Sequence, residues 1–145
     1  MNSPNFKYSA DYIHDGTGFV PGRVLVTDRE GTVVDLVKEA EAGEGVRHIE
    51  GILCPGFVNA HCHLELSHMQ GAIPEHTGLV DFLLAVMSGR SFPPDQIAEA
   101  AYRAESSMLE AGIVAVGDIS NTALTAPIKA RDRLYYHTFV ETIGV

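Results

Sequence analysis

The chain has 145 residues, 46% of them hydrophobic, and a formal net charge of −9. This length allows one domain, or a small domain with part of another, and the composition is that of a globular protein. Because a strongly negative chain repels phosphate, we expect no nucleic acid and no anionic membrane surface among its partners.

The N-terminal residues contain no apolar core of signal-peptide length. No segment approaches the roughly 18 consecutive apolar residues of a membrane span. The two cysteines, Cys54 and Cys62, are too few for a disulfide framework. We therefore expect a soluble, cytoplasmic protein in a reducing compartment.

The first part of the sequence alternates short apolar runs with turn residues rich in Gly and Asp. This pattern predicts short strands joined by tight turns, and hence an antiparallel sheet. We expect a solvated loop at residues 39–45. The predicted strands cover residues 8–14, 22–27, 32–37 and 46–53.

The pattern changes after Pro55-Gly56. Apolar runs that predict buried strands alternate with segments of helical periodicity, and this alternation is typical of parallel strands joined by helical crossovers. The buried strands are expected at residues 57–63, 113–118 and 134–143. Helices are expected at residues 79–87, with its apolar side chains in the core, and from Pro93 to a C-terminal cap at Gly112, with a short helix or loop at 122–132.

His61 and His63 lie at the end of the first of these buried strands. Residues two apart in a strand project from the same face, and two imidazoles at that spacing can reach one metal ion. The carboxyl ends of parallel strands are also where ligands gather in α/β folds. Because the pattern is short, a pair of surface histidines without a ligand is the alternative.

The segment from Leu53 to His63, LCPGFVNAHCH, resembles the PGFVxxHxH signature of the amidohydrolase superfamily. The segment from Ala111 to Asp118 resembles the GxTxxxD second strand of that family. The resemblance implies an α/β protein, with an N-terminal β-sandwich segment at residues 1–54 and the first three β/α units of a TIM-type (β/α)8 barrel at residues 55–145. It also implies that His61 and His63 bind a divalent metal, expected to be zinc, with iron or manganese as alternatives.

The five residues from His63 to Ser67, HLELS, are similar to the HLE(F/L)S of aminodeoxyfutalosine deaminase and its chlorohydrolase and cytosine deaminase-like relatives. This narrower resemblance implies metal-dependent hydrolysis of a carbon–nitrogen bond in a small molecule, namely deamination of an amino-heterocycle or a nucleoside-like compound. Two alternatives stay open. One is hydrolysis of a cyclic amide, as in imidazolone- or dihydroorotase-like enzymes, and the other is a short binding or assembly protein without catalysis.

Three further side chains are candidates for the site. Glu65 is the candidate catalytic residue, orienting the substrate or a water on the metal, with a solvent-exposed loop carboxylate as the alternative. His68 and Asp118 are the candidates for substrate binding, with a surface histidine and a structural carboxylate as their alternatives. We expect His137 in the core of the last strand.

The remaining metal ligands and acid/base residues of the relatives lie on later strands, and a complete barrel needs roughly 250 residues. We therefore expect these 145 residues to be a truncated N-terminal portion that is inactive alone. An apolar strand at residues 135–143 would present an unpaired edge, which natural proteins avoid. We expect this edge to pair with the missing C-terminal part or with another copy in a homo-oligomer.

Overall fold

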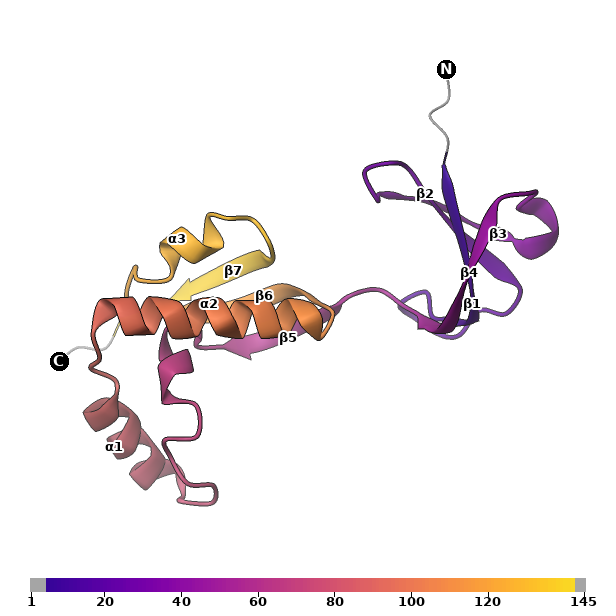
Figure 1. Cartoon of the computed structure of the whole chain (residues 1–145). Helices are drawn as coiled ribbons and strands as arrows, with labels where there is room; N and C mark the ends of the chain where they lie inside the picture. The colour runs from indigo at the N-terminus through magenta and orange to yellow at the C-terminus, as the bar shows by residue number, and fades with distance from the viewer. Residues whose placement is uncertain (1–4, 143–145) are drawn as a thin grey trace. The chain divides into compact units, whose positions relative to one another are not determined.

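The computed structural model describes residues 5–142. The chain divides into two compact units between Pro55 and Gly56, within the Pro-Gly pair at which the sequence pattern changes (Figure 1). Within the described range no helix is long and apolar enough to cross a membrane.

The first unit is a four-stranded sheet in the order β3-β2-β1-β4. All four predicted strands are confirmed, and their pairing corrects one prediction. β2 is antiparallel to β1 and β3, whereas β4 joins the sheet parallel to β1. The reason is that residues 39–45 carry the chain across the sheet, so β4 starts from the same end as β1. The strands are β1 (Phe6–Ile13), β2 (Arg23–Thr27), β3 (Val33–Lys38) and β4 (Val46–Leu53).

The crossing segment is more ordered than the solvated loop predicted for it. It contains the 3-10 helix η1 (Glu39–Glu41), and the next residue, Ala42, is buried. The amine of Lys7 donates hydrogen bonds to the carbonyl oxygens of Ala42 and Glu44. A cation from β1 thus satisfies backbone acceptors that would otherwise need water.

The second unit is a three-stranded sheet in the order β5-β6-β7, with both pairs parallel as predicted. The last residue of the predicted third strand, Ile143, lies outside the described residues. The strands are β5 (Phe57–Cys62), β6 (Ile113–Ser120) and β7 (Tyr135–Val140). The helices are η2 (Leu64–Met69), α1 (Leu79–Gly89), α2 (Pro94–Glu110) and α3 (Ala126–Lys129).

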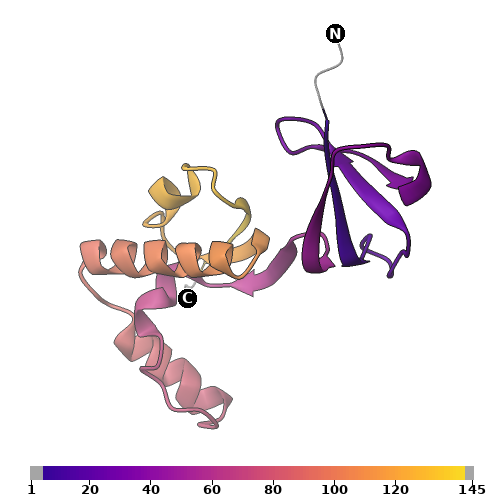
Figure 2. The ribbon, with the colours of Figure 1, turned by 45° about the vertical axis from the view of Figure 1, so that its right-hand side comes forward.

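α2 begins and ends as its sequence predicts. Pro94 stands in the first turn, where a missing N–H costs nothing, and Gly112 takes the left-handed conformation, with φ +77°, just beyond the end. α2 and α3 cover one face of the sheet (Figures 1 and 2). Leu64, Ala101 and Ile128 form the core between these layers.

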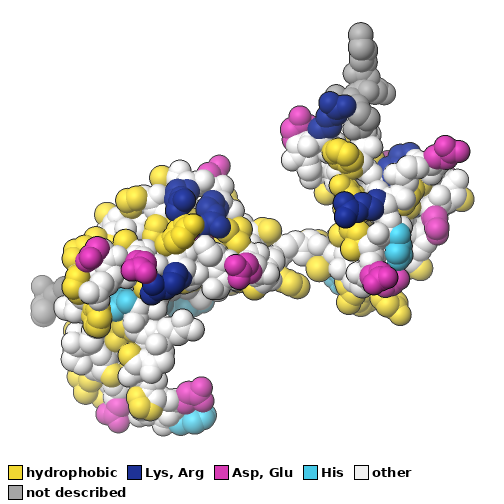
Figure 3. Space-filling view, in the orientation of Figure 1, with side chains coloured by type: hydrophobic (Ala, Val, Ile, Leu, Met, Phe, Trp, Pro, Cys, Tyr) yellow, Lys and Arg dark blue, Asp and Glu magenta, His cyan; other side chains and the backbone are white. Residues whose placement is uncertain are grey.

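The outer strands of this sheet are exposed, although the sequence predicts buried strands. Phe57 on β5 is 61% exposed and Val140 on β7 is 80% exposed. The apolar runs predict strands that are covered on both faces and paired on both sides. In the described sheet, however, β5 and β7 are the edge strands, each paired on one side. Figure 3 accordingly shows hydrophobic side chains on the surface.

The prediction for the apolar side chains of α1 is also wrong. α1 forms where expected, but none of its residues is buried, and Leu79 is 73% exposed. A helix that is apolar around most of its circumference requires apolar surroundings on most sides. The described part of the second unit offers α1 too little surface to provide them.

Candidate metal site

His61 and His63 lie side by side at the carboxyl end of β5. Their ring centroids are 5.3 Å apart, with an angle of 61° between the ring planes. His61 is exposed and His63 is half-buried. Cys62, between them, packs against the core under the helices, so the alternation of the strand sends both imidazoles to the opposite face.

The chemistry of this pair fits a metal ion. Nδ1 of His63 is buried and has no hydrogen-bond partner among the described residues. Neutral imidazole is a common ligand for zinc and related ions, and an unpartnered buried nitrogen is costly. The described residues contain no cluster of three or more His, Cys, Asp or Glu side chains placed to hold one ion. At this position residues 5–142 therefore supply a pair of imidazole donors.

Glu65 follows the pair directly and is buried, with 3% of its surface exposed. Its Oε1 accepts hydrogen bonds from Arg90 Nη2 and the Asn121 backbone N–H, both at 3.1 Å. Its Oε2 accepts from the Thr122 N–H at 3.0 Å and from the Thr122 hydroxyl at 2.7 Å. The alternative of a loop carboxylate in solvent is therefore wrong, because both oxygens are engaged by the chain. Its catalytic role stays a prediction.

The contacts of Glu65 extend into a polar network across the carboxyl edge of the sheet. Arg90 Nη2 also donates to Asn121 Oδ1 at 2.9 Å. Asn121 Nδ2 in turn donates to Glu141, to its carboxylate at 3.0 Å and to its carbonyl oxygen at 2.9 Å. The segments that follow β5, β6 and β7 are thus joined by side chains.

Asp118 is completely buried on β6. Its Oδ1 accepts from the Leu64 N–H at 2.8 Å, and its Oδ2 accepts from the Ser120 hydroxyl at 2.9 Å and from the Lys129 amine at 2.6 Å. It therefore lies on the helix-covered side of the sheet, away from the face that carries the histidine rings. This geometry matches the structural alternative, and contact with a substrate stays a prediction.

The other candidate histidines lie apart from the pair. His68, in η2, donates from Nδ1 to the Glu65 carbonyl oxygen at 3.1 Å and packs against the Phe92 ring at 4.8 Å, so its role toward a substrate stays a prediction. His137 is exposed next to Phe139, and the prediction that it is a core residue is wrong. The reason is that its face of β7 is uncovered.

Glu105 and Arg90 are two ionisable side chains of this unit that were not predicted as important. Glu105 on α2 is completely buried and pairs with Arg133 at 3.1 Å, while the Tyr136 hydroxyl donates to it at 3.2 Å. Burial, and then the Glu105 carboxylate, raise the pKa of the Tyr136 phenol. Glu105 stands four residues after Ala101 on the buried stripe of the helix, and this spacing was a usable signal. Arg90, by contrast, follows α1 with no recognisable pattern.

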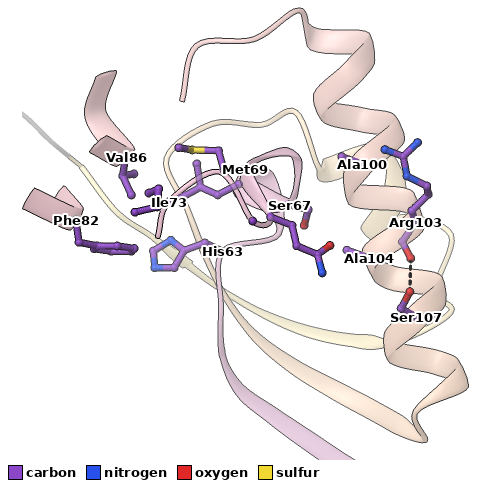
Figure 4. Close-up of a pocket in the computed structure, with 13 residues that line it drawn as sticks. His63, Ser67, Met69, Ile73, Phe82, Val86, Ala100, Arg103, Ala104 and Ser107 are labelled. Atoms are coloured by element: carbon purple, nitrogen blue, oxygen red, sulfur yellow. Dashed lines mark hydrogen bonds between the residues drawn. The ribbon is translucent and has the colours of Figure 1, made fainter. Parts of the chain in front are cut away.

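A cavity of about 790 Å³ lies between η2, α1 and α2, with His63 at one end (Figure 4). Most of its lining is apolar. The side chains around it include Met69, Ile73, Phe82 and Val86. Polar side chains, among them Ser67 and Arg103, also line it.

Comparison with known proteins supplies the context for this site. The sequence model described as the amidohydrolase family matches residues 52–141. No curated protein matches the chain. The family match covers β5, both histidines and all of the second sheet.

Several solved structures share the fold. Aminofutalosine deaminase of Helicobacter pylori, in complex with methylthio-coformycin, has a TM-score of 0.75 and 19% identity, covering 96% of this chain and 36% of that one. An adenosine deaminase of Xanthomonas campestris with bound zinc has a TM-score of 0.65 and 18% identity, covering 88% of this chain and 31% of that one. A mutant atrazine chlorohydrolase of Arthrobacter aurescens, with zinc and atraton, has a TM-score of 0.68 and 23% identity, covering 92% and 35%. The chain thus spans about a third of the length of these structures, and at these identities the likeness concerns the fold.

Proposed function

The chain belongs to the amidohydrolase family, and from that membership we propose that it contributes to a metal-dependent hydrolase of carbon–nitrogen bonds. We propose that the first unit is part of a β-sandwich and that β5, β6 and β7 are the first three strands of a (β/α)8 barrel. The parallel order β5-β6-β7, with helices on one face, supports this arrangement.

The observation that carries the proposal is the pair of histidine rings at the carboxyl end of β5, 5.3 Å apart. His61 and His63 would hold a divalent ion, with zinc as the first candidate because two of the solved structures contain it. When bound, such an ion acidifies a water molecule and polarises the substrate. Packing of Cys62 into the core fixes the strand so that both imidazoles reach the same side.

The proposed substrate is an amino-heterocycle or a nucleoside-like compound that loses its amino group. Two of the solved structures are deaminases, one of aminofutalosine and one of adenosine, and this supports the choice.

We further propose that the 145 residues do not turn over substrate alone. The described residues provide a pair of donors, whereas catalytic zinc sites have three protein ligands. The backbone edges of β5 and β7, which carry exposed apolar side chains, are suited to pairing with further strands, either from a C-terminal part or from another copy.

The experiment is a zinc-binding measurement by equilibrium dialysis on the wild-type chain, His61→Ala, His63→Ala and the control His76→Ala. The side chain of His76 is 95% exposed, so its removal should leave binding unchanged. We expect each of the other variants to lose most of the bound zinc. Equal zinc uptake by the wild type, His61→Ala and His63→Ala would contradict the proposed site. Ammonia release from adenosine or cytosine by the chain with zinc would contradict its inactivity alone.

A further inference from the structure

Hydrogen bonds to buried carboxylates fix both residues that follow His63, Leu64 through the Asp118 carboxylate and Glu65 through its own. His63 itself is the last residue before η2, with φ −122° and ψ 77°, outside the regular helix and strand regions. No regular hydrogen-bond ladder of a strand or helix holds His63, so its direction depends on the contacts of the residues that follow it. The contacts of Leu64 and Glu65 fix this direction.

The first contact holds the backbone immediately after His63. The Leu64 N–H donates to Asp118 Oδ1 at 2.8 Å, and the Leu64 side chain has no exposed surface. Asp118 is in turn fixed by the Lys129 amine at 2.6 Å. The peptide that leaves His63 is therefore tied to β6 and α3.

The second contact holds the next residue through its side chain. The Glu65 carboxylate accepts four hydrogen bonds, from Arg90, the Asn121 N–H, and the N–H and hydroxyl of Thr122. A carboxylate engaged in this way has little capacity left to take a proton from a substrate or water. It has instead the form of a fixed link between η2 and the segment after β6.

We propose that Glu65 and Asp118 are positioning residues that fix the direction of the His63 imidazole toward His61, and that neither touches the substrate. The proposal rests on the proposed function in taking this pair as metal ligands. Groups that orient a metal ligand commonly change metal affinity by about 10–100-fold when they are mutated. The Glu65 and Asp118 contacts act on the backbone of the ligand rather than on its ring.

The test uses the 145-residue chain in two NMR measurements at neutral pH. The first, without metal, records the contact between the His61 and His63 rings by the nuclear Overhauser effect. The second follows the ring signals during titration with Zn²⁺. The variants are Glu65→Gln, Asp118→Asn and Thr122→Val, which removes the 2.7 Å bond to Glu65 with little change in shape. Glu99→Gln is the matched control, since that carboxylate is 69% exposed on α2.

We expect Glu65→Gln and Asp118→Asn to weaken the ring contact and to lower zinc affinity about 10-fold or more. Thr122→Val should lower zinc affinity several-fold, and Glu99→Gln should match the wild type. If the variants melt earlier but keep the ring contact and the wild-type zinc affinity, the two carboxylates serve only stability and the proposal is wrong. Should the carboxylate variants fail to fold, Thr122→Val decides the role of Glu65. Ser120→Ala, which removes the hydroxyl that donates to Asp118 Oδ2 at 2.9 Å, then decides the role of Asp118 by the same two measurements.

Failure of the proposed function has a different signature. If the histidine pair does not bind zinc, the wild-type ring signals do not move during the zinc titration. The positioning role of Glu65 is still tested by the metal-free measurement, in which the ring contact should differ between the wild type and Thr122→Val. An unchanged contact in every folded variant would overturn the positioning proposal whatever zinc does.

Discussion

The Lys129 amine lies 2.6 Å from the Asp118 carboxylate, and this ion pair is enclosed, with 14% of the lysine side chain and none of the aspartate exposed. The lysine also donates to the hydroxyls of Ser120 and Thr138. Removing one member of a buried pair leaves an uncompensated charge, which costs about 3–5 kcal/mol. We therefore expect Lys129→Met to lower the free energy of unfolding by about 3 kcal/mol, measured by urea denaturation of the second unit.

The control for this prediction is Arg103→Met. Arg103 pairs with Glu99 on the surface of α2, with both side chains about two-thirds exposed. Such pairs contribute about 0–1 kcal/mol. Equal losses in the two variants would show that the enclosed pair does not stabilise the fold as argued.

Cys62 should react far more slowly than Cys54 with an alkylating reagent. Burial, and then the Asp118 carboxylate, raise the pKa of the Cys62 thiol to about 11. At pH 8 roughly one part in a thousand is then the reactive thiolate, whereas Cys54 is exposed. We expect iodoacetamide to label Cys54 first, as read by peptide mass spectrometry. Asp118→Asn, which removes the negative charge, should speed the labelling of Cys62. Comparable labelling rates for both cysteines in the wild type would refute the raised pKa of Cys62.

Gly117→Ala should destabilise the second unit. A Cβ at this position would lie 2.7 Å from the Ala60 carbonyl oxygen, a backbone atom that cannot move aside easily. Because Ala60 precedes His61, the strain falls on the strand that carries the histidine pair. We expect a loss of about 1–3 kcal/mol, measured by urea denaturation.

The matched control is Gly18→Ala in the first unit, where an added Cβ meets nothing within 4 Å and φ is not positive. This change should stay within about 0.5 kcal/mol of the wild type. If Gly117→Ala changes the free energy of unfolding as little as Gly18→Ala does, β5 and β6 are not packed as closely as the structure shows.

Asp15→Asn should lower the stability of the first unit at neutral pH but not in acid. Hydrogen bonds from the Thr17 N–H, its hydroxyl and the Gly18 N–H lower the pKa of the Asp15 carboxyl from 3.8 to about 2. A carboxyl with a lowered folded pKa contributes stability above its unfolded value, and that contribution is lost as the pH falls from about 4 toward about 2. Urea midpoints of wild type and variant should therefore differ at pH 7 and converge near pH 2; a constant difference would contradict this origin.

The local pattern of the sequence was enough to predict the strands and the helices α1 and α2, but not η1 or η2, because each apolar run and turn residue acts on its near neighbours. The period of α2 and the Gly112 cap are examples, and so is the direction of the His61 and His63 pair. The parallel pairing of β4 was not predictable in the same way. It depends on how residues 39–45 cross the sheet, which no local pattern encodes.

The site itself was predicted only where it is contiguous in sequence. Glu65 could be named from the HLELS segment, but its partners come from residues 90, 121 and 122. Those contacts arise from packing between segments more than 20 residues apart, and Arg90 carries no sequence signal for them. Burial of β5 and β7 was overestimated for a related reason, since composition reports the surroundings a strand is suited to and not those present in residues 5–142.

The spatial order of β5, β6 and β7 equals their order along the chain. During synthesis, each strand would therefore emerge after the strand with which it pairs, and the helix between the two would already be available to pack on them. Growth of this sheet is by addition at one edge and requires no earlier strand to be displaced. Because a ribosome adds about 5–20 residues per second, each strand and the helix after it would have about a second or more to fold before the next strand emerges.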